Sequence, residues 1–232
     1  MNKMFKEVRK TWSPVVGCLH SCVYCWARKL AEGRLKHTAR FQDGFRPQIS
    51  GINTWPTFRG GLIFVSSMGD MWGDWVRRLW IELVLMNVSE CPKATFLFLT
   101  KNPERYLDFL DQMPPNVILG ATVESNEHYP GISKAPPVYE RLSAMEAIKG
   151  KRTMLSIEPI MDFDLYEFGY QIKLVAPEFV YIGYNNYPKG VCLPEPTLEK
   201  TQALIEELRL FTEVRIKTLR EPLTNFPRSV TL

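Results

Sequence analysis

The stretch ATFLFLTKNPERYLDFL, residues 94–110, contains the pattern that decides the fold. Residues 94–100 form a nearly continuous apolar run, which is typical of a strand buried on both faces of a sheet. Asn102 and Pro103 then suit the N-cap and the first position of a helix, which ends before Pro114. The stretch therefore predicts one β/α unit.

The same unit repeats along the chain, because further apolar runs alternate with segments of helical spacing. The other predicted strands lie at 62–66, 117–123, 153–158, 179–184 and 213–217. A further strand is expected before Cys18. Apolar strands separated by helices are typical of a parallel sheet with helices on its faces. The predicted class is α/β.

The composition is that of one ordered domain. The chain has 232 residues, of which 45% are hydrophobic and 23% are charged, unlike the composition of disordered proteins. No apolar run approaches the roughly 20 residues that span a bilayer, and the N-terminus lacks the apolar core of a signal peptide. We expect a cytoplasmic single domain over residues 1–232, without a membrane partner, in which an irregular segment at about 36–60 is an insertion.

Charge and cysteine content narrow the class of protein further. The net charge of +4 permits a nucleic-acid partner, although Lys and Arg form no continuous basic tract. Five cysteines are an odd number, which argues against a fully paired disulfide framework and fits a reducing compartment. Three of them lie within residues 18–25, and such clustering indicates a bound metal.

Polar side chains follow the predicted strands at the points where the strands end. The carboxyl ends of parallel strands in a barrel meet at one rim, where active sites are assembled. We therefore expect a site at this rim. The polar residues at the strand ends include Ser66, Ser67, Asp70, Lys101, Glu124, Ser125, Glu158 and Lys217.

The clustered cysteines, Cys18, Cys22 and Cys25, have the spacing CxxxCxxC. A structural zinc site usually takes four protein ligands, so His20 or His37 would have to complete it. Three thiolates can instead hold a four-iron four-sulfur cluster and leave one iron open to another ligand. Both kinds of centre remain open at this point.

The sequence CLHSCVYC resembles the motif of the radical S-adenosylmethionine (SAM) superfamily, including Tyr24 before the last cysteine. The motif lies after an expected strand and opens a helix, and the β/α units that follow are similar to a partial (β/α)6 TIM-like barrel of parallel strands. The blocks TWSPVVGC, FVSSMGDMW, FLTKNPERY and PPNVILGATVES also resemble a phage-type radical SAM family of unassigned reaction. More distantly, the chain resembles spore photoproduct lyase, a DNA-repair member of the superfamily.

The resemblance implies that Cys18, Cys22 and Cys25 hold a 4Fe-4S cluster whose fourth iron is chelated by SAM. It further implies that one electron, from a donor such as flavodoxin or ferredoxin, cleaves SAM to a 5′-deoxyadenosyl radical that abstracts hydrogen from a substrate. Asp70 or nearby backbone carbonyls would bind the amino group of SAM, and Lys101 its carboxylate. The full set of implied SAM contacts is Tyr24, Ser67, Asp70, Lys101, Glu124, Ser125 and Glu158.

Several of these residues could instead have purely structural roles. Lys101 could be a solvated residue before a helix, and Glu158 could cap a neighbouring helix or pair with Arg152. The alternating Arg215 and Lys217 face one side of the last strand, where an anionic substrate or salt bridges to Glu124 or Glu158 would neutralise them.

Other conspicuous side chains are expected to be structural. Trp72, Trp75 and Trp80 are interpreted as mostly core residues. Cys91 and Cys192 are single and distant from the cluster; either could supply a hydrogen atom to a product radical, but each is interpreted first as a buried structural cysteine.

Two functions from different classes follow. The first is a radical SAM enzyme with an unidentified substrate, for which a nucleic acid is the first candidate and a small metabolite or a peptide remains open. The alternative is a non-catalytic zinc or iron-sulfur module that binds nucleic acid.

Overall fold

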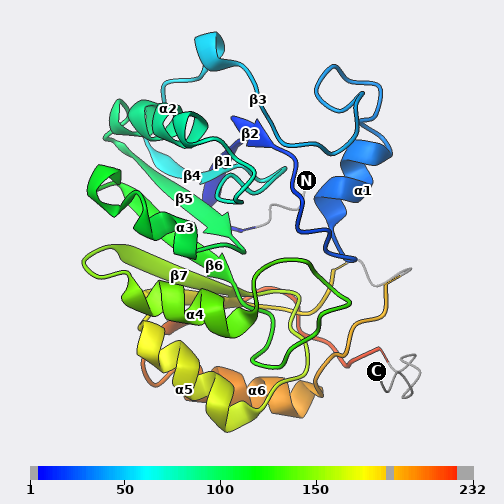
Figure 1. Cartoon of the computed structure of the whole chain (residues 1–232). Helices are drawn as coiled ribbons and strands as arrows, with labels where there is room; N and C mark the ends of the chain where they lie inside the picture. The colour runs from blue at the N-terminus through cyan, green and yellow to red at the C-terminus, as the bar shows by residue number, and fades with distance from the viewer. Residues whose placement is uncertain (1–4, 187–190, 224–232) are drawn as a thin grey trace.

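The computed structural model describes residues 5–186 and 191–223. Seven parallel strands form one sheet in the order β1-β4-β5-β6-β7-β8-β9, curled into an open half-barrel (Figure 1). Each strand pairs with the next one along the chain, as β/α crossovers of one hand require. The strands are β1 (Val8–Trp12), β4 (Gly61–Val65), β5 (Ala94–Thr100), β6 (Val117–Thr122), β7 (Arg152–Ile157), β8 (Phe179–Ile182) and β9 (Glu213–Ile216).

Helices join the strands, and all but the first of them cover the convex face of the sheet (Figure 1). A separate two-stranded antiparallel ribbon is formed by β2 (Val15–Val16) and β3 (Gln48–Ile49). The helices are α1 (Trp26–Glu32), α2 (Arg78–Ser89), α3 (Glu104–Leu107), α4 (Val138–Ala147), α5 (Leu165–Val175) and α6 (Leu198–Leu208), with 3-10 turns at Ile52–Thr54 and Leu110–Gln112.

The predicted α/β class and partial barrel are confirmed, and the strand expected before Cys18 is β1. One predicted cap is wrong: the helix after β5 begins at Glu104 with Pro103 at its N-cap. The side chain of Asn102 instead donates to the carbonyl of Trp72 at 3.0 Å, because it is buried against the loop after β4.

The two faces of the sheet bury different apolar sets, because side chains alternate along each strand. The convex face belongs to the main core under the helices. The concave face carries a smaller apolar cluster, in which the ring centroids of Phe5 and Tyr181 lie 4.4 Å apart. The members of this inner cluster are Phe5, Val8, Phe64, Leu97, Ile118, Met154, Phe179 and Tyr181.

The irregular segment before β4 packs onto the cysteine loop. Phe41 and Phe45 form a small core with Val16 and two alanines of α1, Ala27 and Ala31. This third core holds the insertion against the edge of the half-barrel where α1 begins.

No helix within the described ranges, 5–186 and 191–223, is both long and apolar enough to cross a membrane.

Gly17 joins three segments and needs to be glycine. Its φ is +81°, and a Cβ at this position would lie 2.1 Å from the carbonyl oxygen of Arg46. We predict that Gly17→Ala lowers the free energy of unfolding by at least about 3 kcal/mol, because it adds a backbone clash to the cost of left-handed φ.

Gly44→Ala is the matched control in urea unfolding. Gly44 also has a positive φ, +86°, but nothing lies within 4 Å of its added Cβ, so only about 1 kcal/mol should be lost. Equal losses in the two variants would contradict the predicted contact between Gly17 and Arg46.

Candidate active site

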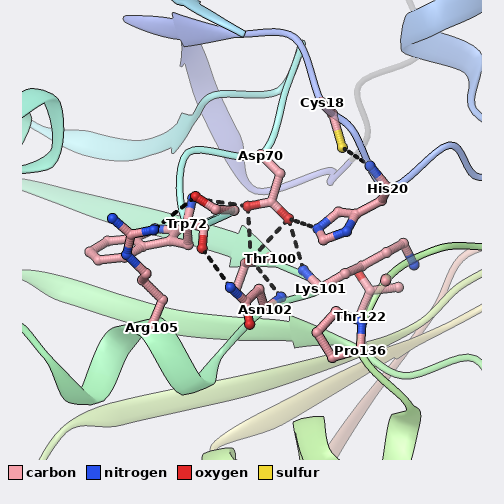
Figure 2. A network of polar contacts seen from close by, with 12 residues as sticks. Cys18, His20, Asp70, Trp72, Thr100, Lys101, Asn102, Arg105, Thr122 and Pro136 are labelled. Atoms are coloured by element: carbon pink, nitrogen blue, oxygen red, sulfur yellow. Dashed lines mark hydrogen bonds and ion pairs between the residues drawn. The ribbon is translucent and has the colours of Figure 1, made fainter. Parts of the chain in front are cut away.

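The carboxylate of Asp70 connects the cysteine loop to the ends of β4 and β5 (Figure 2). Its Oδ2 atom accepts from His20 Nε2 at 3.0 Å and from the backbone N–H of Lys101 at 3.0 Å. Its Oδ1 atom accepts from the backbone N–H of Trp72 at 3.0 Å and from Thr100 Oγ1 at 2.8 Å. Donors from three separate segments therefore converge on one buried carboxylate.

Asp70 is buried yet stays ionised. Burial by itself raises the pKa of its carboxyl, but the hydrogen bond and charge of His20, with the donors at Lys101 and Thr100, lower that pKa below its ordinary value. The side chain is 5% exposed. Its contacts therefore make Asp70 a link between segments, and the contact with SAM that the sequence suggested stays a prediction.

The three clustered cysteines lie on the loop that leads into α1, and all three are half-buried free thiols. Cys25 is the N-cap of α1, where its sulfur accepts from the backbone N–H of Arg28 at 3.3 Å. Burial raises the pKa of the Cys18 and Cys25 thiols. Binding to a metal centre would have to deprotonate them, as it does for thiol ligands in general.

The loop between β6 and α4 packs onto the cysteine loop. Val23 donates its N–H to the carbonyl of Ile132 at 3.0 Å, and Lys134 donates to the carbonyl of His20 at 2.7 Å. Between these two contacts, Ser133 Oγ lies 3.1 Å from Cys22 Sγ. A thiolate at Cys22 could only accept in this pair, so the serine hydroxyl would be the donor.

The donor set fits an iron-sulfur cluster. Three free thiols on one half-buried loop match the ligands that such clusters use. Within the described ranges, no three His, Cys, Asp or Glu side chains are placed to surround a single metal ion. A four-iron cluster binds each thiolate to a different iron, so its ligands lie farther apart than those of one ion.

Glu124, directly after β6, is the centre of a second buried charge cluster. It pairs with Lys101 and accepts from the hydroxyl of Tyr24, and Arg141 Nη1 donates to it at 2.7 Å. The ammonium of Lys101 lies 5.4 Å from the ring centroid of Tyr24. Burial opposes ionisation of Glu124, but the charges of Lys101 and Arg141 lower its pKa to about 2.

The structure thus brings several of the predicted SAM contacts together. Tyr24, Lys101 and Glu124 are in direct contact, and Asp70 joins them through the backbone of Lys101. All four lie where the cysteine loop meets the strand ends, as expected for a rim site.

The remaining predicted contacts make separate interactions. Ser67 Oγ lies 3.3 Å from Ser13 Oγ. Ser125 donates to the backbone carbonyl of Asp162 and accepts from the backbone N–H of Glu127 at 2.9 Å.

Glu158 also lies apart from the Glu124 cluster, with its own partners. It pairs with Lys217 and accepts from Asn186 Nδ2 at 2.7 Å, whereas Arg152 binds Glu178. Of the alternatives that the sequence left open, the pairing of Glu158 with Arg152 is wrong and the salt bridge between Lys217 and Glu158 is the one present, because β9 brings Lys217 beside Glu158.

Other sequence expectations are partly met. Trp72 is buried in the main core, and Trp75 and Trp80 pack against it. Cys91 is buried as expected, but Cys192 is exposed, which contradicts its interpretation as a buried residue.

Sequence reasoning missed residues that complete the site. Arg141 donates to Glu124 and to the carbonyls of Thr122 and Pro136, and Ser133 meets Cys22. Both residues come from the segment after β6, where no motif marks them. A small hollow lies beside them, between Glu124, Tyr129, Ile132, Pro137 and Met161.

The fold and the rim site define an α/β half-barrel whose cysteine loop faces the strand ends. Residues 4–175 match a family model described as "Protein of unknown function (DUF5131)", and the chain belongs to this family. A search of the curated proteins gave no match.

The chain is similar in fold to two solved radical SAM enzymes. Spore photoproduct lyase complexed with dinucleoside spore photoproduct aligns with a TM-score of 0.56 and 10% identity, over 84% of this chain and 59% of that chain. SuiB of Streptococcus suis bound to S-adenosylmethionine aligns with a TM-score of 0.55 and 8% identity, over 91% and 50%. This chain thus spans about half to three fifths of these relatives.

The low pKa of Glu124 predicts a specific dependence of stability on pH. Its folded pKa of about 2 lies below the ordinary value of 4.5 for a glutamate, so the ionised group stabilises the fold above about pH 4.5. On the order of 3 kcal/mol of the free energy of unfolding should be lost as the pH falls from about 4.5 to about 2. Glu124→Gln should lack this part of the loss.

Urea unfolding at several pH values measures this difference. Glu146→Gln is the control, because Glu146 is exposed and forms none of the salt bridges described. If Glu124→Gln keeps the full acid loss of the parent, the electrostatic role assigned to Glu124 is wrong.

Proposed function

We propose that this chain is a radical SAM enzyme. The observation that carries the proposal is the arrangement of three free thiols on one loop, fastened to the strand ends of a half-barrel. Cys18, Cys22 and Cys25 would hold a 4Fe-4S cluster. When bound, such a cluster supplies one electron to SAM, and the cleavage yields methionine and a 5′-deoxyadenosyl radical that abstracts hydrogen from the substrate.

The protein's own residues would position SAM and the cysteine loop. Lys101 would turn from Glu124 toward the carboxylate of SAM, and Arg141 would keep Glu124 neutralised while it does so. Tyr24 lies against both Lys101 and Glu124 and would pack on the bound nucleoside. Ser67, Ser125 and Glu158 remain candidates for contacts at the edge of the site.

Asp70 would act on the loop rather than on SAM. Because its oxygens already accept from four donors, we assign the amino group of SAM to backbone carbonyls near Ser67 instead. His20 faces Asp70 through Nε2 and stacks edge-on against Trp75 at 4.8 Å between ring centroids. These contacts favour a role for His20 in loop position over a fourth metal ligand.

The electron and the substrate must come from other molecules. A low-potential donor such as flavodoxin or ferredoxin would supply the electron. One structural neighbour is complexed with a dinucleoside, which supports a nucleic acid as the candidate substrate.

The decisive experiment is made anaerobically on protein reconstituted with iron and sulfide. With SAM and dithionite, the parent should form 5′-deoxyadenosine, and a variant with Cys18, Cys22 and Cys25 all changed to Ala should form none. Iron and zinc contents are measured beside it. Bound zinc without formation of the nucleoside would overturn the proposal in favour of a metal-binding module.

Lys101 tests the proposed binding of SAM. Lys101→Gln removes a charge-assisted hydrogen bond, so the Kd for SAM should rise about 10- to 100-fold. Equilibrium dialysis of the reconstituted protein measures it, and Lys101→Arg should recover most of the affinity. An unchanged Kd in Lys101→Gln would remove Lys101 from the SAM site.

A further inference from the structure

Positive charge is concentrated at the beginning of the chain. Residues 1–60 hold eleven Lys and Arg against three Asp and Glu, a net charge of +8. Residues 61–232 hold 18 against 22, a net charge of −4. The modest total of +4 therefore hides two parts of opposite sign.

Much of this charge lies on a structural unit that we call the basic cap, residues 26–50. It consists of α1 and the segment that follows it, folded over the small core of Phe41 and Phe45. Cys18 and Cys25 pack against the same core. Figure 1 places α1 on the side of the molecule toward which β5 points, beside the candidate active site.

The cations of the cap are exposed and lack acidic partners. The cap carries six Lys and Arg against two acids, Glu32 and Asp43. Arg28 is half-buried and donates to the carbonyl of Cys18 at 3.1 Å, whereas the others are exposed. In the described structure none of the exposed cations of the cap forms a salt bridge; these are Lys29, Arg34, Lys36, Arg40 and Arg46.

The character of this surface favours a nucleic acid over an acidic protein. Between residues 26 and 50, all of which the structure describes, no large hydrophobic side chain is exposed. Protein interfaces need an apolar or aromatic centre, and Lys is depleted in them. Nucleic-acid interfaces are polar and strongly positive, and cations that contact phosphates supply most of their sequence-independent affinity.

A second basic surface belongs to the same part of the chain. Arg9 and Lys10 of β1, with Arg59, line a hollow that has no acidic residue in its lining. None of the three forms a salt bridge in the described structure. The unbalanced charge of residues 1–60 is thus available at the surface in both places.

We propose that the basic cap binds the phosphate backbone of a nucleic acid and presents one of its nucleotides to the rim beside the cysteine loop. The naming of this substrate class rests on the proposed function, but the binding surface does not. The cap would contact phosphates without reading bases, so its affinity would depend on salt more than on sequence.

The test measures binding of fluorescein-labelled 20-nucleotide single strands, DNA and RNA in separate arms, by fluorescence anisotropy over a range of KCl concentrations. The cap variant is the triple change Lys29→Gln, Arg34→Gln and Lys36→Gln. The control variant, Lys149→Gln, Lys173→Gln and Arg209→Gln, removes the same charge from exposed positions on the helical layer. Both variants therefore have the same net charge.

The cap variant should bind on the order of 100-fold more weakly than the parent at about 0.1 M salt, because each lost phosphate contact costs about 0.7 of a log unit there. The slope of the logarithm of its binding constant against the logarithm of the salt concentration should also be shallower by about two. The control variant should bind as the parent does. The arm with the tighter parent affinity identifies DNA or RNA.

Three outcomes would overturn the proposal: no binding by the parent, equal weakening in both variants, or displacement of the oligonucleotide by polyglutamate at equal charge concentration. The last result would point to an acidic protein instead. If 5′-deoxyadenosine is formed but the two variants bind the oligonucleotide equally, the role of the basic cap is wrong and the proposed function stands. If the variants differ in binding but no 5′-deoxyadenosine is formed, the basic cap binds nucleic acid and the proposed function is wrong.

Discussion

The site depends on one buried carboxylate. Asp70 collects hydrogen bonds from His20 on the cysteine loop, from Trp72 in its own loop, and from Thr100 and Lys101 at the end of β5. A buried anion without such donors would be strongly destabilising, so each segment is held in place by the need to satisfy it. The position of the thiols relative to the barrel therefore follows from electrostatics, since the cysteine loop itself has little regular structure.

A second buried anion, Glu124, is also held by partners from several segments, but two of its partners are cations. These cationic partners are Lys101 and Arg141. The cluster of these three side chains therefore has a net charge of one positive unit. Arg141 is held by backbone carbonyls as well, whereas Lys101 is a flexible stem whose ammonium group has Glu124 as its ion-pair partner. Of the two cations, Lys101 is the one that can exchange partners, and an anionic ligand is the partner that such a cluster favours.

The sequence predicted the sheet well because each strand is an apolar run with a helix or turn after it. It predicted the cysteine loop because the spacing of the three cysteines can be read directly from the order of residues. It could not predict that the side chain of Asn102 bonds to Trp72 instead of capping the helix, or that Arg141 and Ser133 enter the site, and it left open whether Glu158 pairs with Arg152 or with Lys217. These contacts depend on which loops the curled sheet brings together, and no local pattern encodes that.

The basic cap and the cysteine loop form one mechanical unit. Gly17 precedes the first cysteine, its N–H donates to the carbonyl of Met68 in the loop after β4, and the backbone of Arg46 lies against it so closely that no side chain fits. The insertion that the sequence marked only as irregular is therefore fixed against the loop that carries the thiols. This close-packed backbone contact fixes the position of the cap relative to the rim, without a charged residue between them. A polyanion bound to the cap would therefore be held at a defined position relative to the rim.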